Sequence, residues 1–284
     1  MRALLIGFGD LAQRLAPQLL AAGWQIRGLR RSPADFPGVE MLKGDCRNPE
    51  VVAAALADQD LVIITLTPAA FTPEAYKHAY VDSAEAICAA LKSRKDKGES
   101  LPRHLIWVSS TSVYGAGKGE WVNEHSETNP GSFSGRCLLE AEQLLAAACV
   151  PVTIVRFSGI YGGDSTRMLD QVRAGHCAAA EPVQWSNRIH REDCVGVLNH
   201  LATLVEEGKR LAPVYLATDC EPVPLHEVHR WLAQRLQIPF KVVEGRSVTR
   251  GNRRCSNQLL LASGYQFTYP TFREGYAQPV ACSL

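Results

Sequence analysis

A glycine-rich turn near the start of the chain constrains the fold more than any other feature. The turn Gly7–Ala12 follows a short apolar run, Ala3–Ile6, and opens an amphipathic stretch, Asp10–Ala22. A Gly-x-Gly-x-x-Ala turn between a strand and a helix is typical of dinucleotide binding, because glycines permit a tight turn and leave room for a pyrophosphate at the helix start. The residues predicted to make this contact are Gly7, Phe8, Gly9, Asp10 and Leu11.

Apolar runs alternate with helical patterns through the first half of the chain. This alternation predicts an α/β fold, a doubly wound parallel sheet of the Rossmann type. The predicted strands are Ala3–Ile6, Gln25–Leu29, Glu40–Leu42, Leu61–Thr65, His104–Ser109 and Val152–Phe157. The predicted helices are Asp10–Ala22, Pro49–Ala57, Glu74–Lys92 and Gly135–Ala148, and the charged segment Ser93–Ser100 is expected to be a solvated loop.

After Gly162 the alternation becomes irregular, which predicts a second, smaller lobe. Its expected elements are a helix over Leu225–Leu236, a short strand over Phe240–Val243 and a turn of helix after Ser256. We therefore expect a dinucleotide-binding domain over 1–162, to which 188–218 returns, and a partly discontinuous lobe over 163–187 and 219–284. Ligands of such sheets bind beyond the carboxyl ends of the strands.

The bulk composition argues against several classes of partner. A net charge of +1 with 21% charged residues gives no field that favours nucleic acid or a membrane surface. No apolar stretch is long enough to span a bilayer. The nine cysteines, from Cys46 to Cys282, form no Cys-x-x-Cys pair and are expected to be reduced thiols in a cytoplasmic protein. No metal site is expected: His226 and His229 could touch one metal, but a surface helix is the better interpretation.

The end of the second predicted strand indicates which dinucleotide fits. The sequence there is Gly28-Leu29-Arg30-Arg31-Ser32, without the carboxylate that would bind a ribose 2′-hydroxyl. Two guanidinium groups and a hydroxyl suit a 2′-phosphate, which favours NADP, with NAD possible; alternatively, the arginines simply face water. The remaining predicted cofactor contacts are Asp45, which could equally be an ordinary turn residue, Leu66 and Ser109.

Several later segments resemble one known family. They are Val108–Gly115, Gly135–Glu142, Val155–Gly162, Ile189–Asp193, Asn252–Asn257 and Tyr269–Gly275. Together they are similar to the extended short-chain dehydrogenase/reductases, which include sugar-nucleotide epimerases and dehydratases. The resemblance keeps the order of the motifs along nearly the whole chain.

The resemblance implies a hydride-transfer site with a strand-five hydroxyl, a tyrosine on the next helix and a lysine one turn later. By position the hydroxyl is Ser110, with Thr111 beside it. The tyrosine and lysine positions hold Ser134 and Leu138 instead. Sliding the register by two residues gives Ser132 and Arg136, which restores a cation but no tyrosine. The chain thus resembles an atypical branch of the family, and loss of general acid–base help typically costs about 10²–10⁴ in rate.

Other residues could carry the proton. Tyr114 is the first candidate, although a packed tyrosine is the alternative, and Tyr161 is weaker. His190 could titrate near neutrality, but a histidine bonded to a backbone carbonyl is the simpler interpretation. Asp193 is expected to cap a helix over Cys194–Leu204. Cys137 is expected to be inert, and the residues that could line a cleft of the second lobe, or simply lie on its surface, are Arg167, Trp185, Asn187 and Arg188.

Two functional hypotheses remain open. The first is an NADP-dependent oxidoreductase, epimerase or dehydratase that acts on a sugar-nucleotide-like or polyol substrate through Ser110 and a non-standard proton carrier. The second is a catalytically silent protein that senses or scaffolds through NAD(P) binding. The resemblance also implies a possible homodimer through the helices predicted over Glu74–Lys92 and Gly135–Ala148. The apolar residues that could form the dimer contact are Leu138, Leu139, Leu144 and Leu145, although they could equally belong to the core.

Overall fold

The computed structural model describes residues 1–32, 34–115, 117–163, 166–243 and 251–281. The chain divides into two compact units. Unit 1 comprises Met1–Val113, Thr128–Arg156 and Val195–Tyr215. Unit 2 comprises Tyr114–Glu127, Phe157–Cys194 and Leu216–Leu284. The domain boundaries expected from the sequence stay a prediction.

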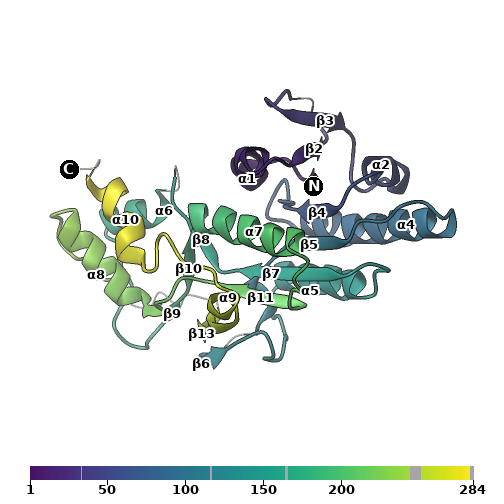
Figure 1. Cartoon of the computed structure of the whole chain (residues 1–284). Helices are drawn as coiled ribbons and strands as arrows, with labels where there is room; N and C mark the ends of the chain where they lie inside the picture. Colours follow the sequence, from purple (N-terminus) through teal and green to yellow (C-terminus); the bar gives the residue numbers. More distant parts are fainter. Residues whose placement is uncertain (33, 116, 164–165, 244–250, 282–284) are drawn as a thin grey trace. The chain divides into compact units, whose positions relative to one another are not determined.

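A seven-stranded parallel sheet has the strand order β11-β7-β5-β4-β1-β2-β3 (Figure 1). The strand order reverses between β1 and β4, and in folds of this kind the crevice outside the carboxyl ends of the strands at such a switch point binds the ligand. The predicted doubly wound α/β fold is therefore confirmed. The strands are β1 Arg2–Ile6, β2 Gln25–Arg30, β3 Val39–Lys43, β4 Leu61–Ile64, β5 His104–Ser110, β7 Val152–Phe157 and β11 Val214–Ala217.

Helices α2, α4 and α5 pack on one face of this sheet (Figure 1). Leu4 and Ile6 of β1 join a buried core with Val52 of α2, Ile87 of α4 and Leu145 of α5. Alternate strand residues point to opposite faces, so Ala3 and Leu5 are buried on the other side of the sheet. The helical segments are α1 Asp10–Ala21, α2 Pro49–Ala55, α3 Pro73–Tyr76, the π-helix η1 Lys77–Val81, α4 Asp82–Asp96, the 3₁₀ turn η2 Thr111–Val113, α5 Phe133–Ala146 and α7 Arg191–Glu206.

Unit 2 is built from short strands and helices around its own core, which includes Leu169, Val228, Leu232 and Phe272. Its strands pair as β8 with β10, β9 with β12 and β6 with β13. The elements are β6 Lys118–Val122, β8 Gly159–Tyr161, α6 Arg167–Arg173, β9 Trp185–Ser186, β10 Arg188–His190, β12 Val223–Pro224, α8 Leu225–Arg235, β13 Asn252–Cys255, α9 Gln258–Ala262 and α10 Phe272–Ala281.

The predicted helix over Glu74–Lys92 and the loop after it need correction. The helix consists of three consecutive pieces, α3, η1 and α4, and α4 continues to Asp96 through half of the expected loop. The reason lies at Arg94, which is 6% exposed despite its charge. Its guanidinium donates to the carbonyls of Ala53 and Ser100 at 2.9 and 3.1 Å and pairs with Glu99 at 2.8 Å.

Two expectations for the second half are also wrong. Phe240–Val243 forms no strand; Val242 makes only a single bridge to Cys177. Asp193 does not cap a helix, because α7 begins two residues earlier, at Arg191. The predicted helix over Leu225–Leu236 and the turn of helix after Ser256 are present as α8 and α9.

The cysteines within the described residues are free: Cys46, Cys88, Cys137, Cys149, Cys177, Cys194, Cys220 and Cys255. The ninth, Cys282, lies outside the described residues. In the part of the chain that the structure describes, no helix is both long enough and apolar enough to cross a membrane.

Candidate cofactor and active site

The glycine turn after β1 is held by the end of β4. Gly7 has a φ of 80°, which favours glycine, and a Cβ there would lie 3.0 Å from the Thr65 carbonyl oxygen and 3.0 Å from Leu66 Cδ2. The Thr65 hydroxyl donates a hydrogen bond to the Gly7 carbonyl at 2.8 Å. Leu66 thus lies against the turn, and its contact with the cofactor stays a prediction.

Helix α1 begins at this turn without a side-chain cap. Its N-cap residue is Gly9, where a Cβ would meet no heavy atom closer than the Gly7 carbonyl oxygen at 3.8 Å. The Asp10 carboxylate pairs with Arg14 at 3.1 Å, which reduces its repulsion of an anion. An open glycine at a positively polarised helix start fits the pyrophosphate of a dinucleotide.

The side chains of Phe8 and Leu11 are fully and partly buried beside this turn. The Phe8 side chain is buried against Gly28, where a Cβ would lie 2.8 Å from Phe8 Cδ2, and its ring meets Phe36 edge-on at 5.2 Å. Phe8 therefore offers its backbone rather than its ring to a ligand. Leu11 is half-buried in the first turn of α1.

Positive charge gathers where β2 and β3 end. Arg30 pairs in register with Lys43, while Arg31 and Ser32 are exposed directly after β2. Hydrogen bonding from Arg47 lowers the pKa of Asp45, and the charge of Arg31 acts in the same direction. Because Arg47 binds Asp45 at 2.5 Å, the carboxylate is largely neutralised and the remaining charge of this edge is positive. A phosphate group fits such a site.

The hydroxyl groups at the end of β5 have different surroundings. Ser109 is buried and donates to Glu142 Oε1 at 2.5 Å, so its hydroxyl holds α5 on the sheet. Ser110 is half-buried and its Oγ accepts from the Ser112 amide at 3.2 Å. Thr111 is buried at the start of η2. Of these three side chains, Ser110 is the most accessible.

The first turn of α5 lies against η2. A Cβ at Gly135 would collide with the Ser112 carbonyl oxygen, so only glycine allows this approach. The N-cap Ser132 accepts from the Gly135 amide at 3.1 Å, and its Oγ lies 3.0 Å from Ser134 Oγ. The contact through Ser112 brings the Ser132–Ser134 hydroxyl pair to the same corner of unit 1 as Ser110.

The face of α5 that holds Ser134 continues through Leu138 to Glu142, at intervals of one helical turn. Leu138 is 3% exposed, so the position of the family's lysine holds a core side chain. Glu142 forms a buried ion pair with Arg156 of β7 at 2.6 Å. This pair and the Ser109 bond fix the position of α5 on the sheet. Leu138 and Leu145 are thus core residues, whereas Leu139 and Leu144 are half-buried.

The other proton-carrier candidates lie in unit 2. The Tyr114 hydroxyl donates to the Asn123 carbonyl at 2.8 Å. The Tyr161 hydroxyl donates to the Thr271 carbonyl at 3.5 Å, and burial raises the pKa of Tyr161. Burial lowers the pKa of His190, whose Nδ1 accepts from the Glu192 amide at 3.3 Å rather than donating to a carbonyl. Tyr114, Tyr161 and His190 are therefore side chains held by hydrogen bonds within unit 2.

Several polar residues of unit 2 have structural partners that the sequence did not reveal. Asp193 is buried and accepts from the Tyr265 hydroxyl at 2.9 Å and from the Thr268 and Tyr269 amides at 2.8 and 2.9 Å. His229 is 2% exposed rather than on a surface helix, and its Nδ1 accepts from the Ala178 amide. Among the described residues, no group of three side chains is arranged to hold a metal ion.

Of the residues expected near a cleft of the second lobe, Asn187 and Arg188 use their side chains in hydrogen bonds within unit 2. Asn187 bonds the Arg253 carbonyl and the Cys255 amide at 2.9 and 2.7 Å. Arg188 is buried and donates to the Ser186 carbonyl at 3.4 Å. Trp185 is half-buried and Arg167 is exposed.

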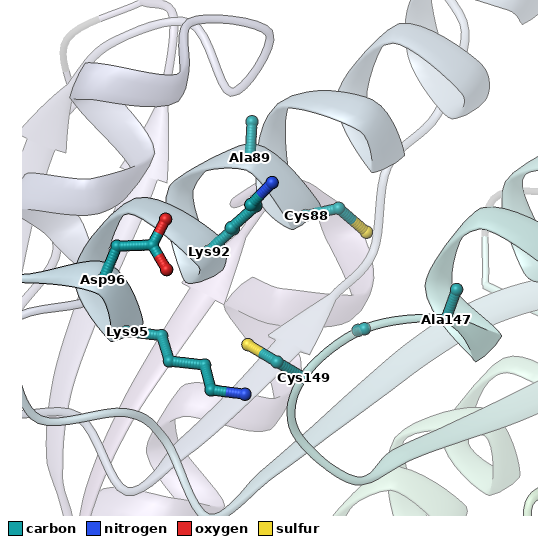
Figure 2. Close-up of a pocket in the computed structure, with 8 residues that line it drawn as sticks. Cys88, Ala89, Lys92, Lys95, Asp96, Ala147 and Cys149 are labelled. Carbon is teal, nitrogen blue, oxygen red and sulfur yellow. The ribbon is translucent and has the colours of Figure 1, made fainter.

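A cavity of about 440 Å³ lies away from the glycine turn. In Figure 2, the side chains of Cys88 and Lys95 of α4 point toward the side of the cavity that carries Cys149, just before β7. Since α4 follows the carboxyl end of β4 and runs back along the sheet, this cavity lies toward the amino ends of the strands. Its lining residues are Cys88, Ala89, Lys92, Lys95, Asp96, Ala147, Ala148 and Cys149.

The glycine turn, the strand order and the uncapped start of α1 define a dinucleotide-binding protein of the Rossmann class. A family model described as NAD(P)H-binding matches residues 7–197, and the chain belongs to this family. The expected relationship to the epimerase and dehydratase branch of the short-chain dehydrogenase/reductases is confirmed by the family match and by the solved structures that the chain resembles.

The chain is similar to relatives of nearly equal length. Protein YeeZ of Escherichia coli strain K12 is 30% identical over 285 residues, which cover 94% of this chain and 95% of YeeZ. A candidate NAD-dependent epimerase/dehydratase of Methylobacillus flagellatus has a TM-score of 0.79 and 33% identity, over 99% of this chain and 98% of that one. MoeE5 in complex with UDP-glucose and NAD shares the fold, with a TM-score of 0.77, 20% identity and coverage of 99% and 98%.

Proposed function

We propose that this protein is an NADP(H)-dependent enzyme, an epimerase, dehydratase or oxidoreductase, that acts on a sugar-nucleotide-like or polyol substrate. The observation that carries the proposal is the open glycine turn at the uncapped start of α1, within the same unit as the Ser110 and Ser134 hydroxyls. The Methylobacillus relative, described as an NAD-dependent epimerase/dehydratase, supports the reaction class, and the MoeE5 complex with UDP-glucose supports the substrate class.

The preference for NADP follows from charge. Arg30 ends β2, Arg31 and Ser32 follow it, and the Asp45 carboxylate, after β3, is paired with Arg47. A 2′-phosphate would gain charge-assisted hydrogen bonds there, whereas a bare ribose hydroxyl would meet no free carboxylate in this cluster. The MoeE5 complex contains NAD, so the preference has to be measured on this chain.

The side chains have distinct proposed roles at the reacting end. Ser110 holds the substrate oxygen, and the Ser132–Ser134 pair supplies a second hydroxyl group. The nicotinamide ring, when bound, donates or accepts the hydride. Tyr114 remains the proposed proton carrier, and its hydroxyl would have to exchange the Asn123 carbonyl for the substrate oxygen. Leu138 is a core side chain that cannot bind a ribose, so cofactor positioning would depend on the glycine turn and the arginines.

Cofactor titration tests the binding half of the proposal. Energy transfer from protein tryptophan to the reduced nicotinamide measures the Kd of NADPH and NADH. We expect Arg31→Ala to weaken NADPH binding about 10-fold, since a charge-assisted bond is worth about 1.5–3 kcal/mol when partly exposed, and to leave NADH binding unchanged. Arg210→Ala, another exposed arginine of unit 1, is the matched control. Equal losses for both cofactors would contradict the 2′-phosphate role.

Hydride exchange tests the catalytic half. Deuterium transfer from 4-deuterated NADPH to a panel of keto-sugar nucleotides and other carbonyl compounds is followed by mass spectrometry. We expect stereospecific transfer that falls in Ser110→Ala and Tyr114→Phe, while Gly9→Asp loses cofactor binding altogether. Tight NADPH binding with no deuterium transfer to any compound of the panel would instead support the second hypothesis, a catalytically silent NAD(P)-binding protein. Full activity in Ser110→Ala would remove the role assigned to that hydroxyl.

A further inference from the structure

Five aromatic rings of unit 1 form a continuous series of contacts from the core to the solvent, here called the aromatic ladder. Trp107 of β5 is fully buried and meets Tyr80 at 6.4 Å between ring centroids. Tyr80 contacts Tyr76 at 5.6 Å, and Tyr76 contacts Phe133 at 5.4 Å. The last ring, Phe71, meets Phe133 at 5.0 Å and is 69% exposed. Contiguous apolar surface, rather than a single exposed side chain, marks binding sites, and here Phe71 is contiguous with the half-buried rings of Tyr76 and Phe133.

The exposed ring is held in place by its surroundings. Phe71 also packs against Tyr76, edge to face, at 5.4 Å, so its ring contacts two neighbours. The next residue, Thr72, caps α3 by accepting from the Ala75 amide at 3.2 Å, and Pro73 occupies the first turn. A capped turn and two ring contacts preorganise Phe71, and preorganisation lowers the entropy cost of binding.

The ladder ends beside the proposed reacting groups. Phe133 is the first residue of α5 and directly precedes Ser134, whose hydroxyl bonds Ser132. Helix α3 and the π-helix η1 follow the carboxyl end of β4, the edge where ligands of this fold bind. Single π-helical turns occur frequently at functional sites, and this one lies between Tyr76 and α4.

The nearest charges of η1 are already paired. Asp82 binds Lys77 Nζ at 2.5 Å and His78 Nδ1 at 2.5 Å. The exposed Glu74 of α3 lies between Phe71 and Tyr76 in the sequence and disfavours an anionic ligand, while the ring faces themselves carry no charge. A neutral planar group fits such a surface, because aromatic rings stack or meet edge to face at these separations.

We propose that Phe71, Tyr76 and Phe133 form a subsite for a planar, neutral ring that the substrate carries close to its reacting carbon. The assignment rests on the proposed function, since it places that carbon at Ser110 and Ser134. It narrows the polyol part of the proposed substrate class to alcohols, and their carbonyl counterparts, that bear an aryl or other flat unsaturated ring; a sugar nucleotide, whose base is separated from the sugar by a diphosphate, does not meet this requirement. A fully saturated polyol would leave the subsite unfilled.

Saturation-transfer NMR tests the subsite with two probes that differ in planarity, 1-phenylethanol and 1-cyclohexylethanol, with the protein in saturating NADP⁺. The wild type is expected to bind the phenyl probe more tightly than the cyclohexyl probe. Phe71→Ala is expected to weaken binding of the phenyl probe about 3- to 10-fold. Phe71→Tyr should retain it, and Phe71→Leu should lose the preference for the planar probe. Leu261→Ala, an exposed apolar residue of unit 2, is the control and should change nothing.

The outcomes separate the subsite from the proposed function. NADPH binding without binding of 1-phenylethanol, or unchanged binding in Phe71→Ala, would overturn the subsite and leave the proposed function standing. If NADPH does not bind, the proposed function fails, and the same titration without cofactor still decides the subsite. Analytical ultracentrifugation of Phe71→Ala covers the remaining possibility: a smaller assembly than the wild type would make the ladder a contact between copies and overturn the subsite.

Discussion

Buried carboxylates of the two units differ in how their charge is compensated. In unit 1, the Glu142 carboxylate pairs with the Arg156 guanidinium and accepts a hydrogen bond from the Ser109 hydroxyl. In unit 2, Asp219 is 1% exposed, and its Oδ2 has no hydrogen-bond partner among the described residues. Burial raises the pKa of Asp219 to about 7, against the opposing effect of Arg188. Asp219 is therefore a residue whose protonation should control stability.

Replacement of this carboxyl group should change the pH dependence of unfolding. Below pH 3.8 the Asp219 carboxyl is protonated in both states; between there and about pH 7 the unfolded chain releases the proton and the folded chain keeps it. The free energy of unfolding therefore falls as pH rises through this window, by up to about 4 kcal/mol from this group. Asp219→Asn should lack this contribution. Urea unfolding from pH 4.5 to 8 gives the slope of the unfolding free energy against pH for the wild type and for Asp219→Asn. Equal slopes would contradict the raised pKa of Asp219.

Local sequence identified residues whose roles depend on backbone conformation but not those whose roles depend on distant partners. Gly7 and Gly9 were predicted because a strand, a turn and a helix are encoded within a few residues of one another. The Thr65 hydroxyl contacts Gly7 across 58 residues, and Ser109 contacts Glu142 across 33. Such bonds form only when the sheet is assembled, so no spacing in the sequence reveals them.

At the scale of elements, the strands were predictable because each central strand is a short apolar run buried on both faces. The helix between β4 and β5 was not, since η1 has the same residue types as an α-helix and differs only in its hydrogen bonding. The ladder was missed for a related reason: Phe71 precedes the short helix α3 and Tyr76 ends it, but Phe133 comes from a distant segment that meets them only in the fold.

The position of α5 should depend on its buried ion pair. Glu142→Gln leaves the Arg156 guanidinium buried beside a neutral amide, which typically destabilises a protein by about 3–5 kcal/mol. Glu140→Gln, exposed on the same helix, should change the free energy of unfolding by less than about 0.5 kcal/mol. Urea denaturation followed by tryptophan fluorescence measures both. Similar midpoints for the two variants would show that the pair does not fix α5.

At the scale of the whole molecule, the remaining question is assembly, and we propose a homodimer through the outer surfaces of α4 and α5. Leu138 and Leu145 are core residues and cannot supply that surface. The candidate residues are instead those around the cavity of Figure 2, where Ala89 and Ala147 are exposed beside Cys149. Small side chains of this kind allow helices to approach closely.

A charge at Ala89 should therefore separate the subunits without unfolding the chain. Ala89 is exposed in α4, so Ala89→Glu costs no core packing, but it would place two larger, charged side chains in the proposed contact, where their bulk prevents close approach of the helices. We expect sedimentation velocity to give a dimer for the wild type and a monomer for Ala89→Glu. Ala54→Glu, equally exposed but on α2, is the matched control and should remain a dimer. A monomeric wild type, or an Ala89→Glu variant that stays dimeric, would exclude this surface as the subunit contact.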